Sequence, residues 1–68
     1  MAVYYVNKQA QANGDREVHR YECTYLPSES NRLYFGTFTN CFDTVQEAKK
    51  FYHKSNGCYY CSPECHTT

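Results

Sequence analysis

Three of the five cysteines in this 68-residue chain lie in one short stretch near its end, Gly57-Cys58-Tyr59-Tyr60-Cys61-Ser62-Pro63-Glu64-Cys65-His66. Within this stretch, Cys58 and Cys61 form a C-x2-C motif, whose spacing lets two thiolates bind one tetrahedral metal ion through a tight turn. The same spacing occurs in redox-active pairs, where the N-terminus of a helix activates one thiol. Because Pro63 follows the motif and disfavours such a helix, the pattern favours metal ligation over redox chemistry.

The chain holds few of the aliphatic residues that build a core. Two leucines, four valines, four phenylalanines and no isoleucine make up about 15% of the sequence, below the roughly 20% at which a packed core becomes doubtful. Eight tyrosines replace part of the missing apolar surface. Chains of this size usually need disulfides or a metal ion to fold. Because the number of cysteines is odd, a scheme of disulfides alone leaves one thiol unpaired, which further favours a metal.

The remaining candidate ligands are spread along the chain: His19, Cys23, Cys41, Cys65 and His66. His19 and Cys23 form an H-x3-C motif, and on an extended strand they would lie about 13 Å apart. They can therefore bind one ion only if the chain turns between them. Cys41 lies beside Phe42 and is as well explained by burial in the core as by ligation. His53, beside Lys54, is expected at the surface.

Three segments are expected to form strands, at residues 2–6, 17–21 and 33–38, because they are rich in β-branched and aromatic residues. Asn13-Gly14-Asp15 predicts a turn between the first two. Gly36 within the third strand indicates a bulge or a close approach of another backbone.

A helix is predicted to begin at Asp43, with Gln46 three residues later completing a capping box. Phe42, Val45, Ala48 and Tyr52 recur at helical spacing, and Asn56-Gly57 is expected to end the helix. We therefore expect an α+β fold in a single domain over residues 1–68. It would consist of a small three-stranded antiparallel sheet, one α-helix across a face, and a cysteine-rich C-terminal knuckle.

The ordered set formed by H-x3-C, a helix containing Glu47-Ala48, and C-x2-C resembles a small bacterial metal-binding module related to the zinc domain of the DNA repair protein Ada. The tail resembles that of small stand-alone bacterial proteins of unknown function with the same H-x3-C and C-x2-C pattern. The resemblance covers about residues 17–66. It implies a zinc ion bound by Cys23, Cys58 and Cys61, with His19 as the fourth ligand.

Three further residues keep the identity of the fourth ligand open, because the resemblance leaves Cys41, Cys65 and His66 as extra candidates. For Ada itself, the resemblance would imply a zinc-bound thiolate that accepts a methyl group from DNA. The sequence predicts no basic surface to dock a duplex, so this function is not expected here.

A structural zinc-binding module used for interaction is the function that we expect, and we expect no enzymatic activity. One alternative is a metal-free α+β protein with reduced cysteines or with disulfides such as Cys23–Cys41 or Cys58–Cys61. Another is a thiol–disulfide redox protein that uses Cys58 and Cys61. The sequence contains no paired carboxylates, phosphate-binding glycine loop or Ser-His-Asp set that would indicate another class of enzyme.

Seven basic and seven acidic residues leave the chain without net charge, so the usual electrostatic signature of a nucleic-acid-binding protein is missing. No apolar run is long enough to span a membrane, and the start lacks a charged leader followed by an apolar stretch. We therefore expect a cytoplasmic monomer without a membrane contact or a small-molecule substrate. Its surplus tyrosines are expected to contact a protein or a nucleic acid.

Overall fold

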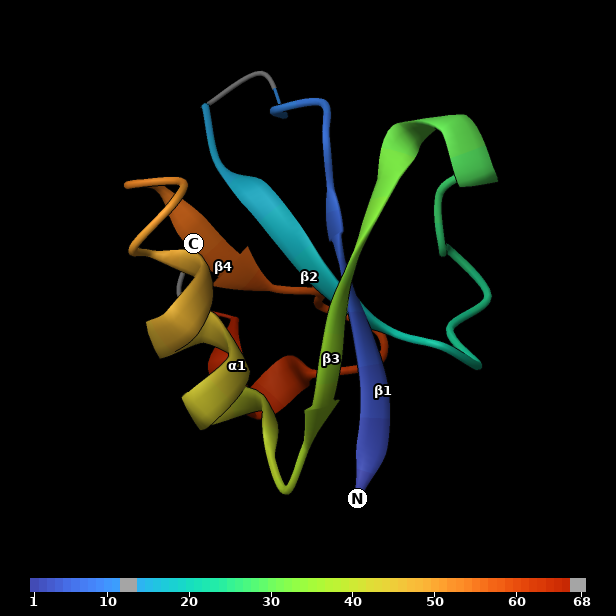
Figure 1. Cartoon of the computed structure of the whole chain (residues 1–68), viewed down its shortest axis with the longest axis vertical. Coiled ribbons are helices and arrows are strands. Elements are labelled where there is room, and N and C mark those ends of the chain that lie inside the picture. The colour runs from blue at the N-terminus through green and yellow to red at the C-terminus, as the bar shows by residue number, and fades with distance from the viewer. Residues whose placement is uncertain (12–13, 67–68) are drawn as a thin grey trace.

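The computed structural model describes residues 1–11 and 14–66, so Asn13 of the predicted turn lies outside the described residues. The elements are four strands, β1 (Ala2–Asn7), β2 (Arg16–Arg20), β3 (Arg32–Phe38) and β4 (Ser55–Gly57), one helix, α1 (Cys41–Ala48), and two 3-10 turns, η1 (Glu29–Asn31) and η2 (Pro63–Cys65). Helix α1 lies to one side of the sheet, and the connection from β2 to β3 lies to the other (Figure 1).

Within the described part of the chain, no helix has the length and apolar character needed to cross a membrane.

The sheet has four strands in the order β3-β1-β2-β4. Its first three strands are antiparallel neighbours, close to the three segments expected from the sequence. The expectation of a purely three-stranded antiparallel sheet is wrong, because β4 adds a short parallel strand beside β2. The sequence Ser55-Asn56-Gly57 carries no β-branched or aromatic residue, so its strand conformation comes from backbone pairing and not from local propensity.

Helix α1 begins earlier than predicted, and the expected cap at Asp43 is wrong. Asn40 is the N-cap, and its side-chain oxygen accepts a hydrogen bond of 2.9 Å from the backbone N–H of Asp43. The helix ends at Ala48 instead of reaching Asn56-Gly57. The segment up to Ser55 leaves the helix because β4 must reach the edge of the sheet. Phe42 of the predicted apolar stripe lies within α1 but is exposed.

The core between the sheet and the helix is small. Its buried members are Tyr4, Val6, Val18, Cys41, Ala48 and Cys65. Within this core, Cys41 and Cys65 form a disulfide, with Cα atoms 6.3 Å apart, which joins the start of α1 to η2. The pairings named in the metal-free alternative, Cys23 with Cys41 and Cys58 with Cys61, are not formed, because Cys23, Cys58 and Cys61 are free thiols. Cys41 is buried, as expected, but it is bonded.

Substitution of Gly57 by alanine is expected to destabilise the fold by about 1–3 kcal/mol, because overpacking forces neighbouring atoms to move. An added Cβ would lie 2.6 Å from Cys65 Cβ and 2.9 Å from the Ser62 carbonyl oxygen. Urea unfolding of the Gly57→Ala variant, compared with an exposed control such as Gln9→Ala, measures the change. Equal unfolding midpoints for both variants would show that the tail is not packed against β4.

Candidate metal centre

His19 and Cys23 are brought together by a turn that begins where β2 ends. Strand neighbours point to opposite faces, so Val18 enters the core while His19 faces the other side of the sheet. The Cys23 N–H donates to the Arg20 carbonyl oxygen at 3.0 Å and closes the turn. Cys23 Sγ then lies 3.5 Å from His19 Nδ1. The condition derived from the sequence, that the chain must turn between these residues, is confirmed.

The C-x2-C motif reaches the same place because β4 pairs with β2. Immediately after β4, the Cys58 N–H donates to the Val18 carbonyl oxygen at 3.0 Å, which fixes the motif beside β2. The Ser62 N–H donates to the Cys58 carbonyl oxygen at 2.8 Å and closes the tight turn that contains Cys61. Cys58 Sγ lies 3.8 Å from Cys23 Sγ. The unpredicted strand β4 is therefore the element that positions this half of the site.

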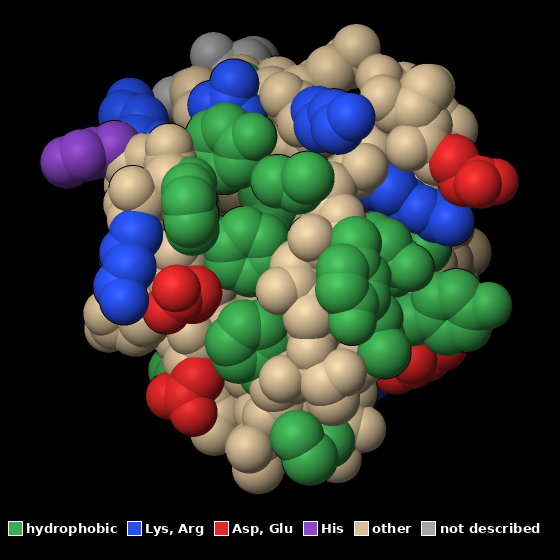
Figure 2. Space-filling view, viewed as in Figure 1, with side chains coloured by type: hydrophobic (Ala, Val, Ile, Leu, Met, Phe, Trp, Pro, Cys, Tyr) green, Lys and Arg blue, Asp and Glu red, His purple; other side chains and the backbone are tan. Residues whose placement is uncertain are grey.

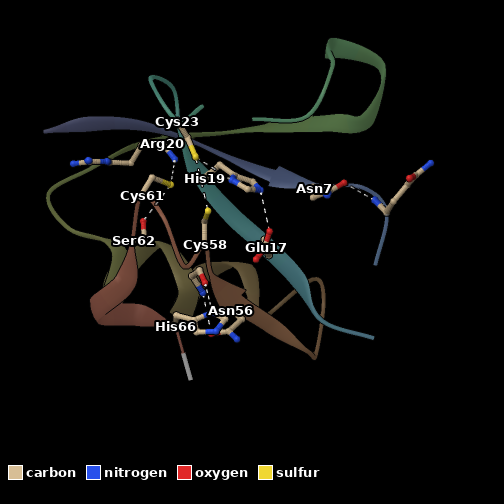
Figure 3. A network of polar contacts seen from close by, with 12 residues as sticks. Asn7, Glu17, His19, Arg20, Cys23, Asn56, Cys58, Cys61, Ser62 and His66 are labelled. Atoms are coloured by element: carbon tan, nitrogen blue, oxygen red, sulfur yellow. Dashed lines mark hydrogen bonds and ion pairs between the residues drawn. The ribbon is translucent and has the colours of Figure 1, made fainter. Parts of the chain in front are cut away.

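Four side chains converge from these two segments, as Figure 3 shows. The ligand atoms of His19, Cys23, Cys58 and Cys61 all lie within 4.8 Å of one another, so the group could hold a metal ion. His19 and Cys58 are each only 1% exposed. Cys23 and Cys61 are partly exposed and border a cleft of about 180 Å³. The structure thus unites the four residues that the sequence and the resemblance indicated as ligands.

The other candidates for the fourth ligand have different roles. Cys41 and Cys65 are bonded to each other. His66 Nδ1 lies 3.1 Å from the Gly57 carbonyl oxygen, to which its N–H donates. His53 is exposed on the surface, as the sequence predicted. The convergent group therefore contains His19 and none of these alternatives.

Backbone N–H groups surround the three sulfur atoms of this group, which we call the Cys3His cluster. The Arg20 N–H donates to Cys61 Sγ at 3.3 Å. The amides of Tyr60 and Cys61 form hydrogen bonds with the Cys58 sulfur, and the Tyr25 amide does so with the Cys23 sulfur. Hydrogen bonds of this kind stabilise the charged form of a thiol. Each sulfur is therefore placed to exist as a thiolate when a cation is present.

The three thiols differ in acidity. Burial raises the pKa of Cys23 to about 12, and burial also raises the pKa of Cys58. Burial acts in the same direction on Cys61, but hydrogen bonds with His19, the Arg20 amide, Cys23 and Ser62 outweigh it and lower the pKa of Cys61 to about 6. At neutral pH the cluster without an ion therefore favours one thiolate. A bound cation is what would favour deprotonation of all three, since metal ligands must be deprotonated.

Glu17 lies behind His19, on the side away from the sulfur atoms. Its Oε1 is 3.5 Å from His19 Nε2, which is buried and forms no hydrogen bond with the described residues. Metal-binding histidines usually direct their second ring nitrogen to a carboxylate or carbonyl, which orients the ring. The His19 ring is therefore already placed to offer Nδ1 to an ion and Nε2–H to Glu17.

Substitution of Glu17 by alanine is expected to lower the affinity for the metal about 10- to 100-fold, the usual effect of losing such a partner. Competition with a chromophoric chelator measures the Kd. Glu29→Ala, which changes an exposed carboxylate in η1, is the matched control and should leave the Kd unchanged. Equal Kd values for the two variants would remove Glu17 from the site.

No protein-family model matches the chain, and neither a curated protein nor a solved structure matches it. Membership of the Ada-like modules is therefore not shown. What the structure supports is the convergence of the H-x3-C and C-x2-C motifs on which the resemblance was based.

Proposed function

We propose that the Cys3His cluster binds one zinc ion and that the chain is a structural zinc module. The observation that supports this most strongly is the spacing of the donor atoms. Tetrahedral zinc, with Zn–S near 2.3 Å and Zn–N near 2.0–2.1 Å, separates two sulfurs by about 3.8 Å and a sulfur from a nitrogen by about 3.6 Å. Two of the six donor distances match these values, 3.8 Å between Cys23 and Cys58 Sγ and 3.5 Å between Cys23 Sγ and His19 Nδ1, and all six are within 4.8 Å.

The donor set supports zinc and a structural role. Thiolate and imidazole ligands in tetrahedral geometry suit zinc better than the hard cations, which prefer oxygen. Structural zinc sites are closed by four protein ligands, whereas catalytic sites keep one position for water or substrate. His19 and the three cysteines supply four donors, so we propose that the ion performs no catalysis.

A cobalt(II) titration tests the ligand set. We expect metal-free protein to bind one Co²⁺ per chain, with the intense ligand-field and sulfur-to-cobalt absorption of a tetrahedral thiolate site, and Zn²⁺ to displace it. His19→Ala should change the spectrum, and His66→Ala is the matched control that should leave it unchanged. Weak octahedral absorption, or equal spectra for the two histidine variants, would contradict the proposal.

The ion would also fix the positions of two exposed tyrosine rings, those of Tyr25 and Tyr60. We propose that these rings form a contact site for a protein or nucleic acid. Tyr25 and Tyr60 stack with ring centroids 4.2 Å apart, although both are more than half exposed. Tyr60 directly precedes Cys61, and Tyr25 lies two residues after Cys23. Stacking of bases on such rings is worth about 1–3 kcal/mol per base. Binding of single-stranded DNA that weakens with salt and with Tyr60→Ala would support a nucleic-acid contact, and absence of binding would leave protein as the partner class.

The lowered pKa of Cys61 supports a second candidate function, thiol–disulfide exchange by Cys58 and Cys61. The near-complete burial of Cys58 restricts access of a substrate disulfide to that sulfur. Catalytic reduction of insulin disulfides by the metal-free protein, abolished in Cys61→Ser, would favour this candidate over a structural site.

A further inference from the structure

Strand β3 is an edge of the sheet, and the side of β3 away from β1 has no strand beside it among the described residues. The Lys8 N–H donates to the Asn31 carbonyl oxygen at 2.8 Å. Since hydrogen-bonded and non-bonded pairs alternate along an antiparallel ladder, the backbone of Leu33 faces β1. The backbone groups of Arg32 and Tyr34 therefore point to the free edge. An edge of this kind is a template for another strand.

An apolar groove lies next to this edge. It has a volume of about 380 Å³ and is lined by Leu33, Tyr34, Phe35, Glu47, Phe51 and Tyr52. Phe51 is 68% exposed and Tyr34 is 60% exposed. The groove is open because α1 ends at Ala48, before it could cover the first half of β3. Figure 2 shows a large group of hydrophobic side chains around a hollow on this face. Grouped apolar exposure of this kind marks an interaction site.

Charge is distributed unevenly along the groove. At the end where β3 begins, the Arg16 guanidinium lies 4.4 Å from the centre of the Tyr52 ring, and Arg16 Nε donates to the Lys8 carbonyl oxygen. Arg32, the first residue of β3, does not line the groove, because its guanidinium lies 4.8 Å from the centre of the Tyr5 ring and donates to the Pro27 carbonyl oxygen. Asp43 lies in the first turn of α1, near the opposite end of the strand. Figure 2 shows most Lys and Arg side chains along the upper side of the hydrophobic group and two acidic groups at its lower left.

We propose that a second copy of this chain docks here, with β3 of each copy paired antiparallel across a two-fold axis. Antiparallel pairing places the basic end of one groove against the acidic end of the other, so the charges are complementary. The chain has no net charge to oppose self-association. Because β3 pairs with the same strand of the other copy across the two-fold axis, the contact is isologous and closes as a dimer.

The size of the surface is typical of a weak, transient contact. A standard stable interface buries about 800 Å² per partner, which is nearly a fifth of the 4321 Å² accessible surface of this chain. A seven-residue edge strand and one groove form a smaller contact. We therefore infer a reversible dimer with a Kd in the micromolar range. This inference does not depend on the metal. It departs from the monomer that the sequence alone leads us to expect.

Sedimentation velocity over a concentration series of the full chain tests the proposal, with Phe51→Ser as the disrupting variant. Each dimer would lose two buried phenyl rings, so the Kd should rise at least tenfold. Phe42→Ser is the matched control, because Phe42 is 58% exposed but lines a separate cleft with Val45 and Glu64. It should dimerise like the parent chain.

Circular dichroism and metal content of each variant separate loss of the dimer from loss of the fold or of the ion. A parent chain that stays monomeric up to the highest concentration would overturn the proposal. Equal Kd values for Phe51→Ser and Phe42→Ser, or growth into open oligomers, would overturn it as well.

Discussion

Replacement of Cys58 by serine is expected to unfold the chain, and not merely to weaken metal binding. Cys58 is 1% exposed, and its sulfur lies between β2 and the tail. A structural zinc ion contributes roughly 10–16 kcal/mol of binding free energy at pH 7, whereas small domains are stable by only about 5–15 kcal/mol. If the proposed ion is bound, its loss would therefore remove most or all of the net stability. Thermal unfolding followed by circular dichroism should show no cooperative transition.

Chelation of the parent chain separates the role of the ion from the packing of the Cys58 side chain. A chelator should abolish the cooperative transition of the parent chain, and added zinc should restore it. Zinc should fail to restore it in Cys58→Ser. A serine variant that unfolds cooperatively within about 1 kcal/mol of the parent chain would contradict this prediction, because that is an ordinary effect for a single substitution.

Removal of the disulfide between Cys41 and Cys65 is expected to cause the second large loss of stability. The two cysteines are 24 residues apart in sequence. Closing a loop of this length lowers the entropy of the unfolded chain by an amount worth roughly 3–4 kcal/mol. The double variant Cys41→Ala/Cys65→Ala should lose about this much free energy of unfolding in urea, measured with the metal bound. Reductant should destabilise the parent chain to a similar extent and have no effect on the double variant.

The metal and the disulfide are expected to act separately. The disulfide joins the tail to α1, while the Cys3His cluster joins the tail to β2 and its following turn. The cobalt spectrum of the double variant should therefore match that of the parent chain. A changed spectrum would show that the disulfide positions the metal ligands, and a parent chain insensitive to reductant would show that the bond does not contribute to stability.

The grouping of His19, Cys23, Cys58 and Cys61 is the part of the candidate site that the sequence predicted best. The C-x2-C spacing and the requirement for a turn after His19 are local properties, readable from a few neighbouring residues. The observed turn, closed by the hydrogen bond from Cys23 to Arg20, meets that requirement. Strands β1 and β3 were also predictable, because their β-branched and aromatic residues are concentrated in short runs.

The remaining features depend on contacts between distant segments. Strand β4 consists of polar residues and glycine, and it exists because its backbone pairs with β2 and its surface is covered by the tail. The pairing of Cys41 with Cys65 could not be deduced, since disulfide connectivity is not encoded in cysteine spacing. The start of the helix does have a local signal, because Asn40 is a favourable N-cap residue, but Asp43 with Gln46 three residues later offers a competing one.

Native mass spectrometry of protein purified without an affinity tag tests the central claim most directly. The account predicts one zinc ion per chain together with one disulfide, and a single loss of zinc on acidification, because the thiolates must be protonated for the ion to leave. A folded, metal-free chain with three reduced thiols would contradict it, since the cluster of His19, Cys23, Cys58 and Cys61 would then hold the chain together without an ion.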